Sequence, residues 1–130
     1  MIGSGVFGYV DVLSSAADAA WTRNEILNNN IANVDTPGYK RQDVRFESVL
    51  RDVIDRQGAG NLTQKVNNVD YRHLKPYVYT DSTNLSTRLD GNNVDIDTEE
   101  AELASNQLMY DGIVTSLNGE FTRMKAILTK

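Results

Sequence analysis

Residues 28–41 read N-N-N-I-A-N-V-D-T-P-G-Y-K-R, and this stretch separates a long helical pattern from a chain of different character. Asn33 favours the end of a helix, because asparagine tolerates the left-handed conformation that helix ends often use. Pro37 disfavours helical geometry at Thr36 and fixes its own φ angle. Pro37 and Gly38 also occupy the two central positions of a type II turn over residues 36–39. The sequence therefore predicts a helix stop followed by a sharp turn at Pro37.

A long helix is expected before this turn, over residues 5–34. Its apolar residues recur at alternating steps of four and three, the spacing of a coiled-coil seam. This N-terminal seam comprises Val6, Val10, Leu13, Ala17, Ala20, Asn24, Leu27, Ile31 and Val34, with Asn24 as its single polar member. A second, weaker stripe of Val12, Ala16, Ala19 and Ile26 runs beside it and is interrupted by Arg23. We expect so wide an apolar surface to contact several neighbours, although an ordinary core helix shows the same pattern.

A second long helix is expected over residues 97–129. Asp97 followed by Glu100 resembles a capping box, and acidic residues cluster where the helix dipole favours negative charge. The same alternating spacing defines a C-terminal seam, which comprises Leu103, Gln107, Tyr110, Val114, Leu117, Phe121, Met124 and Leu128. Gly112 and Gly119 lie opposite this seam, where each weakens an isolated helix by about 1 kcal/mol relative to alanine. We interpret them as close-packing glycines that admit another backbone, with a neutral surface position as the alternative.

The chain between the two helices has a mixed pattern. Residues 43–57 carry Phe46, Val49, Leu50, Val53 and Ile54 at helical spacing, so a short amphipathic helix is expected there. Residues 58–96 are polar and aperiodic, and we expect an irregular segment with short strands around residues 77–79. Alternation on both sides of Asp90-Gly91 is compatible with a small hairpin. The sequence thus predicts one mainly α domain over residues 1–130, in which two long heptad helices pack as a coiled-coil-like pair, residues 35–42 form the turn, and the middle holds the short helix, loops and short β segments.

Composition narrows the function classes. The chain has 130 residues, a net charge of −5 and no cysteine, which removes disulfides and thiolate metal sites. Lysine and arginine are scattered rather than clustered, which argues against a nucleic-acid partner. No apolar run is long enough to span a membrane, and no charged region followed by an apolar core marks a cleavable signal peptide. We therefore expect a protein that is not itself membrane-spanning, and any export would use another route.

The sequence lacks patterns that carry chemistry. His73 is the single histidine and has no second ligand nearby in the sequence to share a metal. Residues 90–97 are rich in oxygen ligands but lack the calcium-loop order, so we interpret them as a turn followed by a helix cap. No Gly-x-Ser-x-Gly elbow, glycine-rich phosphate loop or recognisable acid/base pair occurs. We predict no catalytic, metal or cofactor-binding residues, no small-molecule substrate, and a protein that is not an enzyme.

Two long seams and a modest middle core leave apolar surface that one chain does not account for. Assembly with other chains would bury this surface. The alternative is a stand-alone helical-hairpin interaction module, in which the terminal helices pair only with each other. Isolated helices gain most of their stability from packing. Assembly therefore predicts a free monomer of low helicity that proteases cleave rapidly at both ends, whereas the hairpin module predicts a stable monomer.

These features together resemble a known family. The run at residues 28–41, placed between two terminal heptad helices, is similar to the signature of bacterial flagellar rod and hook axial proteins. The family turn motif falls on Asn29, Asn30, Ile31, Ala32, Asn33, Thr36, Pro37, Gly38 and Tyr39. The short chain and the run L-D-G-N-N-V-D-I-D at residues 89–97 resemble the proximal rod subunit of the flagellar basal body, with another axial rod protein as the nearest alternative.

The resemblance implies a structural protein of the basal body in the cell envelope, exported by the flagellar type III system. Its terminal helices would assemble with one another and with other subunits into an envelope-spanning drive shaft, and would line the inner tube around an export channel. The implied partners are other flagellar rod subunits, a rod-base adaptor protein, the MS ring and the export gate. The turn at Pro37 would direct residues 39–93 outward. We further hypothesise that Asn28, Asn29, Asn30 and Asn33 hydrogen-bond backbone groups of adjacent chains.

Overall fold

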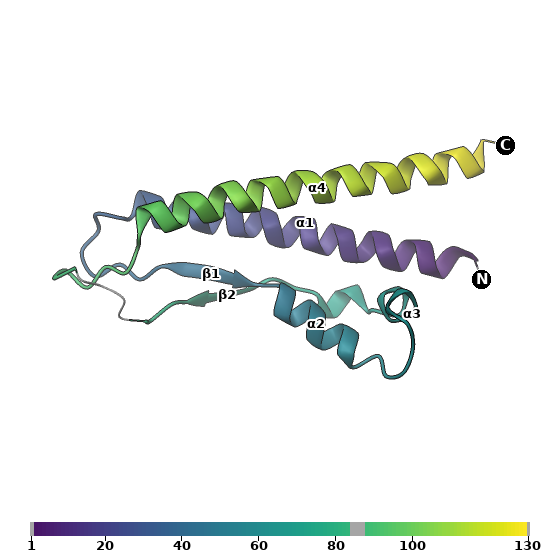
Figure 1. Cartoon of the computed structure of the whole chain (residues 1–130), viewed down its shortest axis with the longest axis horizontal. Helices are drawn as coiled ribbons and strands as arrows, with labels where there is room; N and C mark the ends of the chain where they lie inside the picture. Colours follow the sequence, from purple (N-terminus) through teal and green to yellow (C-terminus); the bar gives the residue numbers. More distant parts are fainter. Residues whose placement is uncertain (1, 84–87, 130) are drawn as a thin grey trace.

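Two long helices define the shape of the molecule. The computed structural model describes residues 2–83 and 88–129. In chain order the elements are α1 (Ile2–Ala32), β1 (Gln42–Arg45), α2 (Glu47–Asp55), α3 (Leu62–Asn67), the 3-10 helix η1 (Tyr71–His73), β2 (Tyr77–Thr80) and α4 (Ile96–Leu128). Helices α1 and α4 run antiparallel, and the two chain termini lie at the same end (Figure 1). The prediction of a mainly α fold with a long helix pair is confirmed. No helix in the described ranges has the length and apolarity needed to cross a membrane.

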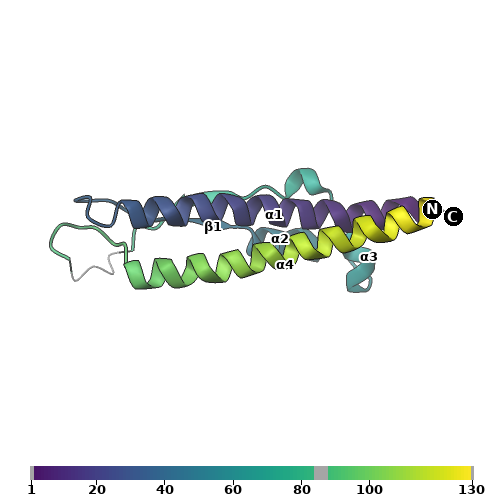
Figure 2. The same cartoon turned by 90° about the horizontal axis from the view of Figure 1, so that it is seen from above.

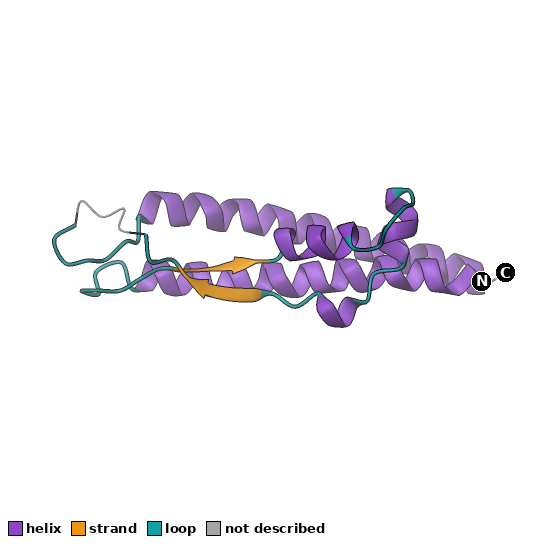
Figure 3. Cartoon of the chain, turned by 90° about the horizontal axis from the view of Figure 1, so that it is seen from below, coloured by secondary structure: helices purple, strands orange, loops and turns teal. Residues whose placement is uncertain are grey.

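Helix α1 is the middle layer of the molecule. Helix α4 covers one side of it, and the strands with α2 and α3 cover another (Figures 1 and 3). The second stripe of α1 supplies Val12, Ala19 and Ile26 to the core, where they cluster with residues of the middle segment: Val44, Phe46, Val69 and Leu74. The second stripe is therefore not a surface left over for other chains, because the chain's own middle segment buries it.

Arg23 interrupts that stripe because it holds the start of α2. Its guanidinium donates to both carboxylate oxygens of Glu47, at 2.8 and 2.7 Å, and to the carbonyl of Val44 at 3.0 Å. The hydrogen bond between them lowers the pKa of Glu47 and raises the pKa of Arg23. Glu47 is the first residue of α2, so this pair ties the short helix to the middle of α1.

The interface between α1 and α4 uses the N-terminal seam but only part of the C-terminal one. From α1, Val10, Ala20 and Leu27 are buried, and the remaining described seam residues are half-buried. On α4 the seam divides into half-buried Leu103, Tyr110, Val114, Leu117 and Met124 and exposed Gln107, Phe121 and Leu128. The buried residues of α4 are Glu99 and Asn106, and residues 103, 110, 113 and 117 are half-buried. Figure 2 shows α4 crossing over α1. Glu99 and Asn106, which lie outside the predicted seam, bond to Asn30 and to the Ala20 carbonyl of α1.

The middle segment differs from the prediction in its first element. Residues 42–45 form β1, which pairs antiparallel with β2, so the helix expected over residues 43–57 begins only at Glu47. Val44 and Phe46 are both buried and lie two positions apart, which is the period of a strand. Arg45 between them points the other way and lies over the ring of Tyr79 at 4.5 Å. Phe46 therefore belongs to the strand pattern and not to the helical one.

Residues 58–96 are more regular than expected. They contain α3, which begins with a capping box formed by Asn61 and Gln64, and the 3-10 helix η1. Strand β2 lies where short strands were expected, around residues 77–79. The hairpin about Asp90-Gly91 is not seen in the described part of that stretch, since residues 88–95 hold a turn and no strand. The residues expected to form its first strand lie largely outside the described ranges, at 84–87.

Helix α1 ends differently from the expectation based on Asn33. None of the described non-glycine residues has a positive φ angle, so Asn33 is not left-handed. Instead its N–H bonds back to the helix and its carbonyl accepts from Thr36 N–H at 3.0 Å. The turn that follows is as predicted, with Gly38 at φ +72° and Tyr39 N–H donating to the Thr36 carbonyl at 3.2 Å. The stop therefore results from tightening turns and from Pro37.

Helix α4 begins at Ile96, so its cap is not the predicted Asp97. The N-cap is Asp95, whose side chain accepts from the backbone N–H groups of Asp97 and Thr98 at 3.1 and 3.4 Å. Aspartate at this position satisfies N–H groups that the helix cannot. The cap therefore lies two residues before the predicted position, and Glu99 makes other contacts, described below.

Candidate functional site

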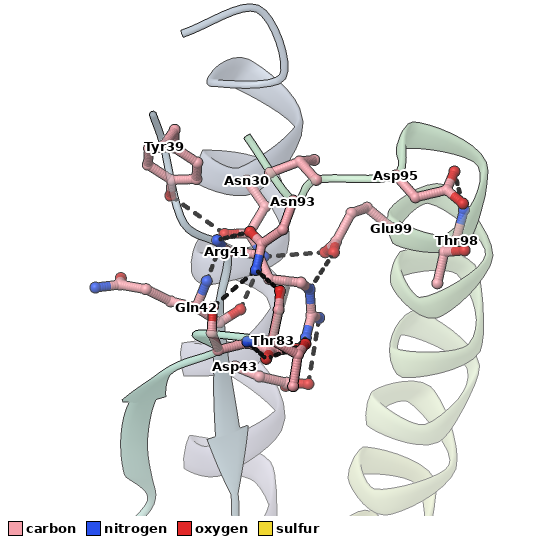
Figure 4. Close-up of polar contacts among 12 residues, drawn as sticks. Asn30, Tyr39, Arg41, Gln42, Asp43, Thr83, Asn93, Asp95, Thr98 and Glu99 are labelled. Atoms are coloured by element: carbon pink, nitrogen blue, oxygen red, sulfur yellow. Dashed lines mark hydrogen bonds and ion pairs between the residues drawn. The ribbon is translucent and has the colours of Figure 1, made fainter. Parts of the chain in front are cut away.

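The two sequence motifs that flank the middle segment meet at one end of the molecule. Residues 28–41 end α1 and turn, and residues 88–95 lead into α4, both at the end opposite the termini (Figure 1). Figure 4 shows the polar contacts that form there. We call this cluster the polar junction, which comprises Asn30, Tyr39, Arg41, Gln42, Asn92, Asn93 and Glu99. Each of these residues makes at least one side-chain or backbone hydrogen bond to a distant segment.

Asn30 is the centre of the polar junction and is fully buried. Its Oδ1 accepts from the backbone N–H of Gln42 at 3.0 Å and from the hydroxyl of Tyr39 at 3.2 Å. Its Nδ2 donates to the carbonyl of Gln42 at 2.8 Å and to Glu99 Oε2 at 3.0 Å. Both polar atoms of the amide therefore have two partners each. This one side chain joins α1, the first residue of β1 and α4.

Glu99 is a buried carboxylate that Arg41 neutralises. Arg41 Nε donates to Glu99 Oε1 at 2.5 Å, and its other nitrogens reach Asp43 and Asp81, each at 3.3 Å (Figure 4). Burial alone would lower the pKa of Arg41, but its contacts with Glu99 and Asp43 outweigh burial and raise it. Burial, helped by the charge of Glu99, raises the pKa of Tyr39. At neutral pH the junction therefore holds a charged arginine and a neutral tyrosine, whose hydroxyl donates a hydrogen bond to Asn30.

Asn92, which lies far from α1 in the sequence, hydrogen-bonds to the backbone at the end of that helix. The side chain is fully buried, and its Nδ2 lies 2.9 to 3.0 Å from the carbonyls of Asn33, Val34 and Thr36. Its Oδ1 accepts from Val94 N–H at 2.8 Å. The last carbonyls of a helix have no partner within the helix. The Asn33 and Thr36 carbonyls already accept within the first motif, so Asn92 gives them a second partner and gives the Val34 carbonyl a partner from the second motif.

Asn93 and Lys40 fasten the same two segments from the other side. Asn93 Oδ1 accepts from the backbone N–H of Arg41 at 2.7 Å, and its Nδ2 donates to the carbonyl of Asp81 at 2.7 Å. Lys40 Nζ donates to the carbonyl of Gly91 at 2.6 Å. Most of these bonds end on backbone atoms, so they fix the path of the chain. The arrangement is a structural lock between the two segments.

Comparison with known proteins identifies a family with these features. The sequence pattern described as "Flagella basal body rod protein" matches residues 11–40, which hold most of the N-terminal seam and the turn motif. The flagellar basal body rod protein FlgB of Bacillus subtilis (strain 168) is 36% identical over 128 residues, covering 94% of both chains. The chain belongs to the FlgB family of flagellar basal body rod proteins. FlgB of Escherichia coli (strain K12) is 34% identical and covers 82% of each chain, and FlgB of Borreliella burgdorferi is 31% identical and covers 94% of this chain and 90% of its own.

Membership of the FlgB family defines the role of the chain at a coarse level. It is a structural subunit of the flagellar basal body rod, and its place is the basal body. The similarity to the Bacillus protein spans nearly the whole chain, so it includes both long helices and the middle segment as well as the turn motif. A rod is an assembly, and a subunit of it works alongside other rod components.

The structure divides the family turn motif into buried and exposed members. Asn30 is buried, the half-buried members are Ile31, Asn33 and Tyr39, and the exposed members are Asn29, Ala32, Thr36, Pro37 and Gly38. Asn28 and Asn33 donate to carbonyls one turn back in their own chain, at 2.9 and 2.8 Å. The hypothesis that the asparagines bond to adjacent chains is wrong for Asn30, because its amide is fully engaged within the chain.

Sequence reasoning did not find Glu99 and Asn106 as interface residues. Asn106 Nδ2 donates to the carbonyl of Ala20 at 2.8 Å in the middle of the α1–α4 interface. Its Oδ1 is buried, and no described residue donates to it. The sequence did contain a spacing that could have indicated them. Glu99 and Asn106 are one heptad apart, and each precedes a seam residue, Leu103 or Tyr110, by four positions. Polar residues repeated at that spacing are a known device for fixing helix register.

The outer face of α4 is not covered by the chain itself. A Cβ atom at Gly112 would meet nothing within 4 Å, and one at Gly119 would lie 3.8 Å from an Arg123 nitrogen. Packing within the chain therefore requires neither glycine. Their interpretation as close-packing positions stays a prediction about neighbouring chains.

Part of the helix-pair surface also stays open. Phe121 is 54% exposed and Leu128 is 84% exposed, although both belong to the C-terminal seam. Trp21 of α1 is 53% exposed and contacts Tyr110 of α4, with ring centroids 6.1 Å apart. We call Trp21, Gln107, Phe121 and Leu128 the open seam. It is the largest contrast with the polar junction, where the named side chains are buried or half-buried.

Proposed function

We propose that this FlgB-family chain builds the proximal part of the rod by packing its α1–α4 pair against neighbouring subunits. The observation that carries the proposal is the open seam, in which the apolar C-terminal seam residues Phe121 and Leu128 and the neighbouring Trp21 are each more than half exposed. Burying apolar surface stabilises by about 25 cal/mol per Å². These side chains therefore favour a helix of another subunit over water. The neighbours are copies of this chain and other rod subunits.

The layered arrangement supports a tube-forming role. The middle segment lies on α1 and leaves α4 uncovered (Figure 3). In a rod this arrangement directs the helix pair toward an inner tube around an export channel, and the middle segment toward the outside. The proposal includes torque transmission through these helices and contacts with the rod-base adaptor, the MS ring and the export gate. It also includes delivery of the chain by the flagellar type III system.

The same proposal holds that the chain catalyses no reaction. The buried carboxylate of the junction, Glu99, accepts hydrogen bonds from Arg41 and Asn30, so both of its oxygens are engaged by the chain itself. Within the described ranges, no three His, Cys, Asp or Glu side chains gather as a metal-binding group. Activity in a cell-wall lysis assay with the purified chain would contradict this part of the proposal.

A stand-alone helical hairpin is the second candidate, and one observation favours it. The second stripe of α1 and the polar junction are complete within a single chain. The two candidates differ in the isolated monomer. Assembly predicts rapid proteolysis at both ends and low helicity, whereas the hairpin predicts a resistant, fully helical monomer.

Substitution of the open seam tests the leading proposal. Phe121→Ser combined with Leu128→Ser is introduced into a motile strain in place of the wild-type copy. We expect loss of swimming and absence of the chain from isolated basal bodies, with the purified variant still soluble. Leu62→Ser is the matched control, because Leu62 is 67% exposed on α3 and lies outside the seam. Equal swimming of both variants would favour the hairpin candidate.

A further inference from the structure

One face of α1 is acidic and mostly exposed in the described chain. Phe7, Asp11, Ser14, Asp18, Trp21, Glu25 and Asn28 follow one another at steps of four and three, so they share a face of the helix. Phe7 is 60% exposed, and Ser14, Asp18, Glu25 and Asn28 are also exposed. We call this set the acidic face. It combines two aromatic side chains with a carboxylate every seven residues.

The carboxylates of the acidic face have no cationic partner in the described chain. Asp11, Asp18 and Glu25 make none of the ion pairs found among the described residues. The single basic residue of α1, Arg23, lies on the opposite side and pairs with Glu47. Successive carboxylates are about 10 Å apart at 1.5 Å per residue. Such a row attracts a partner that carries positive charge.

The last turns of α4 have the opposite character. Residues 121–128 contain Arg123 and Lys125 and no acidic residue. Phe121 is exposed, and Ile127 and Leu128 are more than 70% exposed. Arg123 pairs with Glu120 one turn earlier, and Lys125 makes no ion pair with a described residue. We call residues 121–128 the basic end.

The Asp18 to Asn28 part of the acidic face lies far from the basic end of the same chain. Ala20 contacts Asn106 and Asn30 contacts Glu99, so α1 residues 20–30 lie level with α4 residues 99–106. Lys125 is 125 − 106 = 19 residues beyond that level, about 28 Å along the helix. The Asp18 to Asn28 part of the acidic face can therefore meet a basic end only on another chain.

A cavity beside Trp21 adds an acceptor to this face. It has a volume of about 120 Å³ and lies between α1 and α4, lined by residues that include Trp21, Asn24, Asn106 and Tyr110. Asn106 is 96% buried, and its Oδ1 lacks a donor among the described residues. Lysine and arginine side chains carry only donors. The cavity and the carboxylates thus favour the same kind of partner group.

From these observations we propose that the acidic face of α1 binds the basic end of α4 of a second copy, head to tail. The inference rests on the proposed function and names the surfaces through which copies contact. Aromatic side chains of the face would pack on the apolar residues of the basic end, and carboxylates would pair with Arg123 and Lys125. The contact joins two different surfaces, so each added copy leaves one of each unoccupied. Contacts of this kind propagate into a helical array.

Site-directed cross-linking tests this contact, because the chain contains no native cysteine. Asn28→Cys with Ala126→Cys preserves every charge and places one thiol beside each surface. A bis-maleimide with a reach well below 28 Å cannot join these positions within one chain. We expect purified chain at high concentration to give a ladder of covalent dimers and higher oligomers on a denaturing gel. Ser48→Cys with Ala126→Cys is the control, since Ser48 lies exposed on α2, and it should give only background dimer.

Charge reversal in the same cross-linking background decides whether the named groups carry the contact. Asp18→Lys with Glu25→Lys should lower the dimer yield about tenfold, as should Arg123→Glu with Lys125→Glu. All four reversals in one chain should restore the yield, because the signs are again complementary. Asp52→Lys with Asp55→Lys on α2 should change nothing. The circular dichroism spectrum of each variant should match that of the parent chain, which shows that the reversals leave its structure unchanged.

Each outcome separates this inference from the proposed function. Failure of the four reversals to restore the dimer, or equal yields from the Ser48 control pair, would overturn the head-to-tail contact. Phe121 and Leu128 belong to both the open seam and the basic end, so rod assembly is scored separately from cross-linking, by swimming and by incorporation of each charge-reversed chain into basal bodies. A motile strain whose chain gives no ladder therefore contradicts only the contact. A ladder from a chain that never enters basal bodies contradicts only the proposed function.

Discussion

The two ends of the α1–α4 pair are built from opposite kinds of interaction. At the polar junction, Asn30, Glu99 and Asn92 are buried and their polar atoms are engaged by named partners. Toward the termini, Phe121 and Leu128 are exposed although they belong to an apolar seam. One end is closed by directional bonds within the chain, and the other presents apolar surface that any suitable helix could cover. The polar junction therefore fixes the shape of the chain, whereas the exposed apolar residues near the termini provide affinity for neighbours.

The energetics of the two regions explain why each suits its task. A satisfied buried hydrogen bond adds only about 1 kcal/mol to stability, but leaving one partner unsatisfied costs about 1–3 kcal/mol. The junction therefore penalises every wrong register of α1, β1 and α4. Apolar burial is non-directional and grows with area. The open seam thus gives affinity with little geometric selectivity, and the junction gives selectivity with little affinity.

Asn30→Ala should have the largest effect on stability, because it removes the amide at the centre of the polar junction. The change leaves the Gln42 backbone groups and Glu99 buried with fewer partners. We expect a loss of about 3 kcal/mol in the free energy of unfolding. Urea denaturation followed by circular dichroism measures it.

Asn29→Ala is the matched control for that change, since Asn29 is the neighbouring residue on the same turn and is exposed. It should alter the free energy of unfolding by about 0.5 kcal/mol or less. Similar losses for both variants would show that the junction is not the stabilising element described above.

Asn92 provides a chemical test of the same region. Asn92→Ala removes a donor shared by three carbonyls and should cost about 2 kcal/mol. Asn92→Asp should cost more than Asn92→Ala, because it places a carboxylate against those carbonyls. Denaturation of both variants under the same conditions gives the order, and the reverse order would contradict the capping role.

The glycines of α4 test whether its outer face contacts neighbouring chains. Gly112→Ala and Gly119→Ala should each raise the free energy of unfolding by about 1 kcal/mol, since both are helical and the chain leaves room for a methyl group. If neighbouring backbones approach these glycines, swimming should fall although the monomer is more stable. Gly38→Ala is the contrasting variant, and it should destabilise because Gly38 has φ +72°. Unchanged swimming of both α4 variants would show that Gly112 and Gly119 are neutral surface positions.

The smallest expected effect is on the pH dependence of stability at the Arg23–Glu47 pair. The hydrogen bond from Arg23 lowers the pKa of Glu47 below its ordinary value of 4.5. The pair's contribution is therefore complete above that value and is lost as the pH falls through the lowered pKa. Because Glu47 is more than half exposed, we expect about 1 kcal/mol or less. The difference in unfolding free energy between wild type and Glu47→Gln, measured from about pH 6 to pH 2, should shrink toward acid; a constant difference would rule the pair out as its source.

Periodicity in the sequence predicted the long elements well because a heptad pattern over many turns is a strong signal. It also located the turn at Pro37 and Gly38, where backbone chemistry is decisive. It did not separate strand from helix at Phe46, since one buried residue fits both periods and only pairing with β2 decides between them. The described residues of the N-terminal seam are buried or half-buried, while Gln107 and Phe121 of the C-terminal seam are exposed. The role of both seams in assembly stays a prediction.

The sequence did not predict the polar junction, because its hydrogen bonds join residues that are far apart along the chain. Asn92 was interpreted as part of a turn, and nothing in residues 90–97 indicates that its amide reaches the carbonyl of Asn33. Glu99 was assigned to the helix dipole, although its carboxylate is buried against Arg41. Residues of the same type, such as Asn29 and Asn30, adopt opposite roles one position apart. Only the three-dimensional arrangement distinguishes a buried asparagine from an exposed one.

The reach of Asn92 also sets an order of events when the chain is made. Asn92 follows Asn33 by 59 positions and Thr36 by 56, yet it closes the carbonyls at the end of α1. A ribosome that has released α1 and the turn has not yet delivered the side chain that seals them. Until residue 92 is made, those carbonyls have only the partners that earlier residues and water supply. A chain truncated before residue 92 therefore cannot form the hydrogen bonds that Asn92 donates.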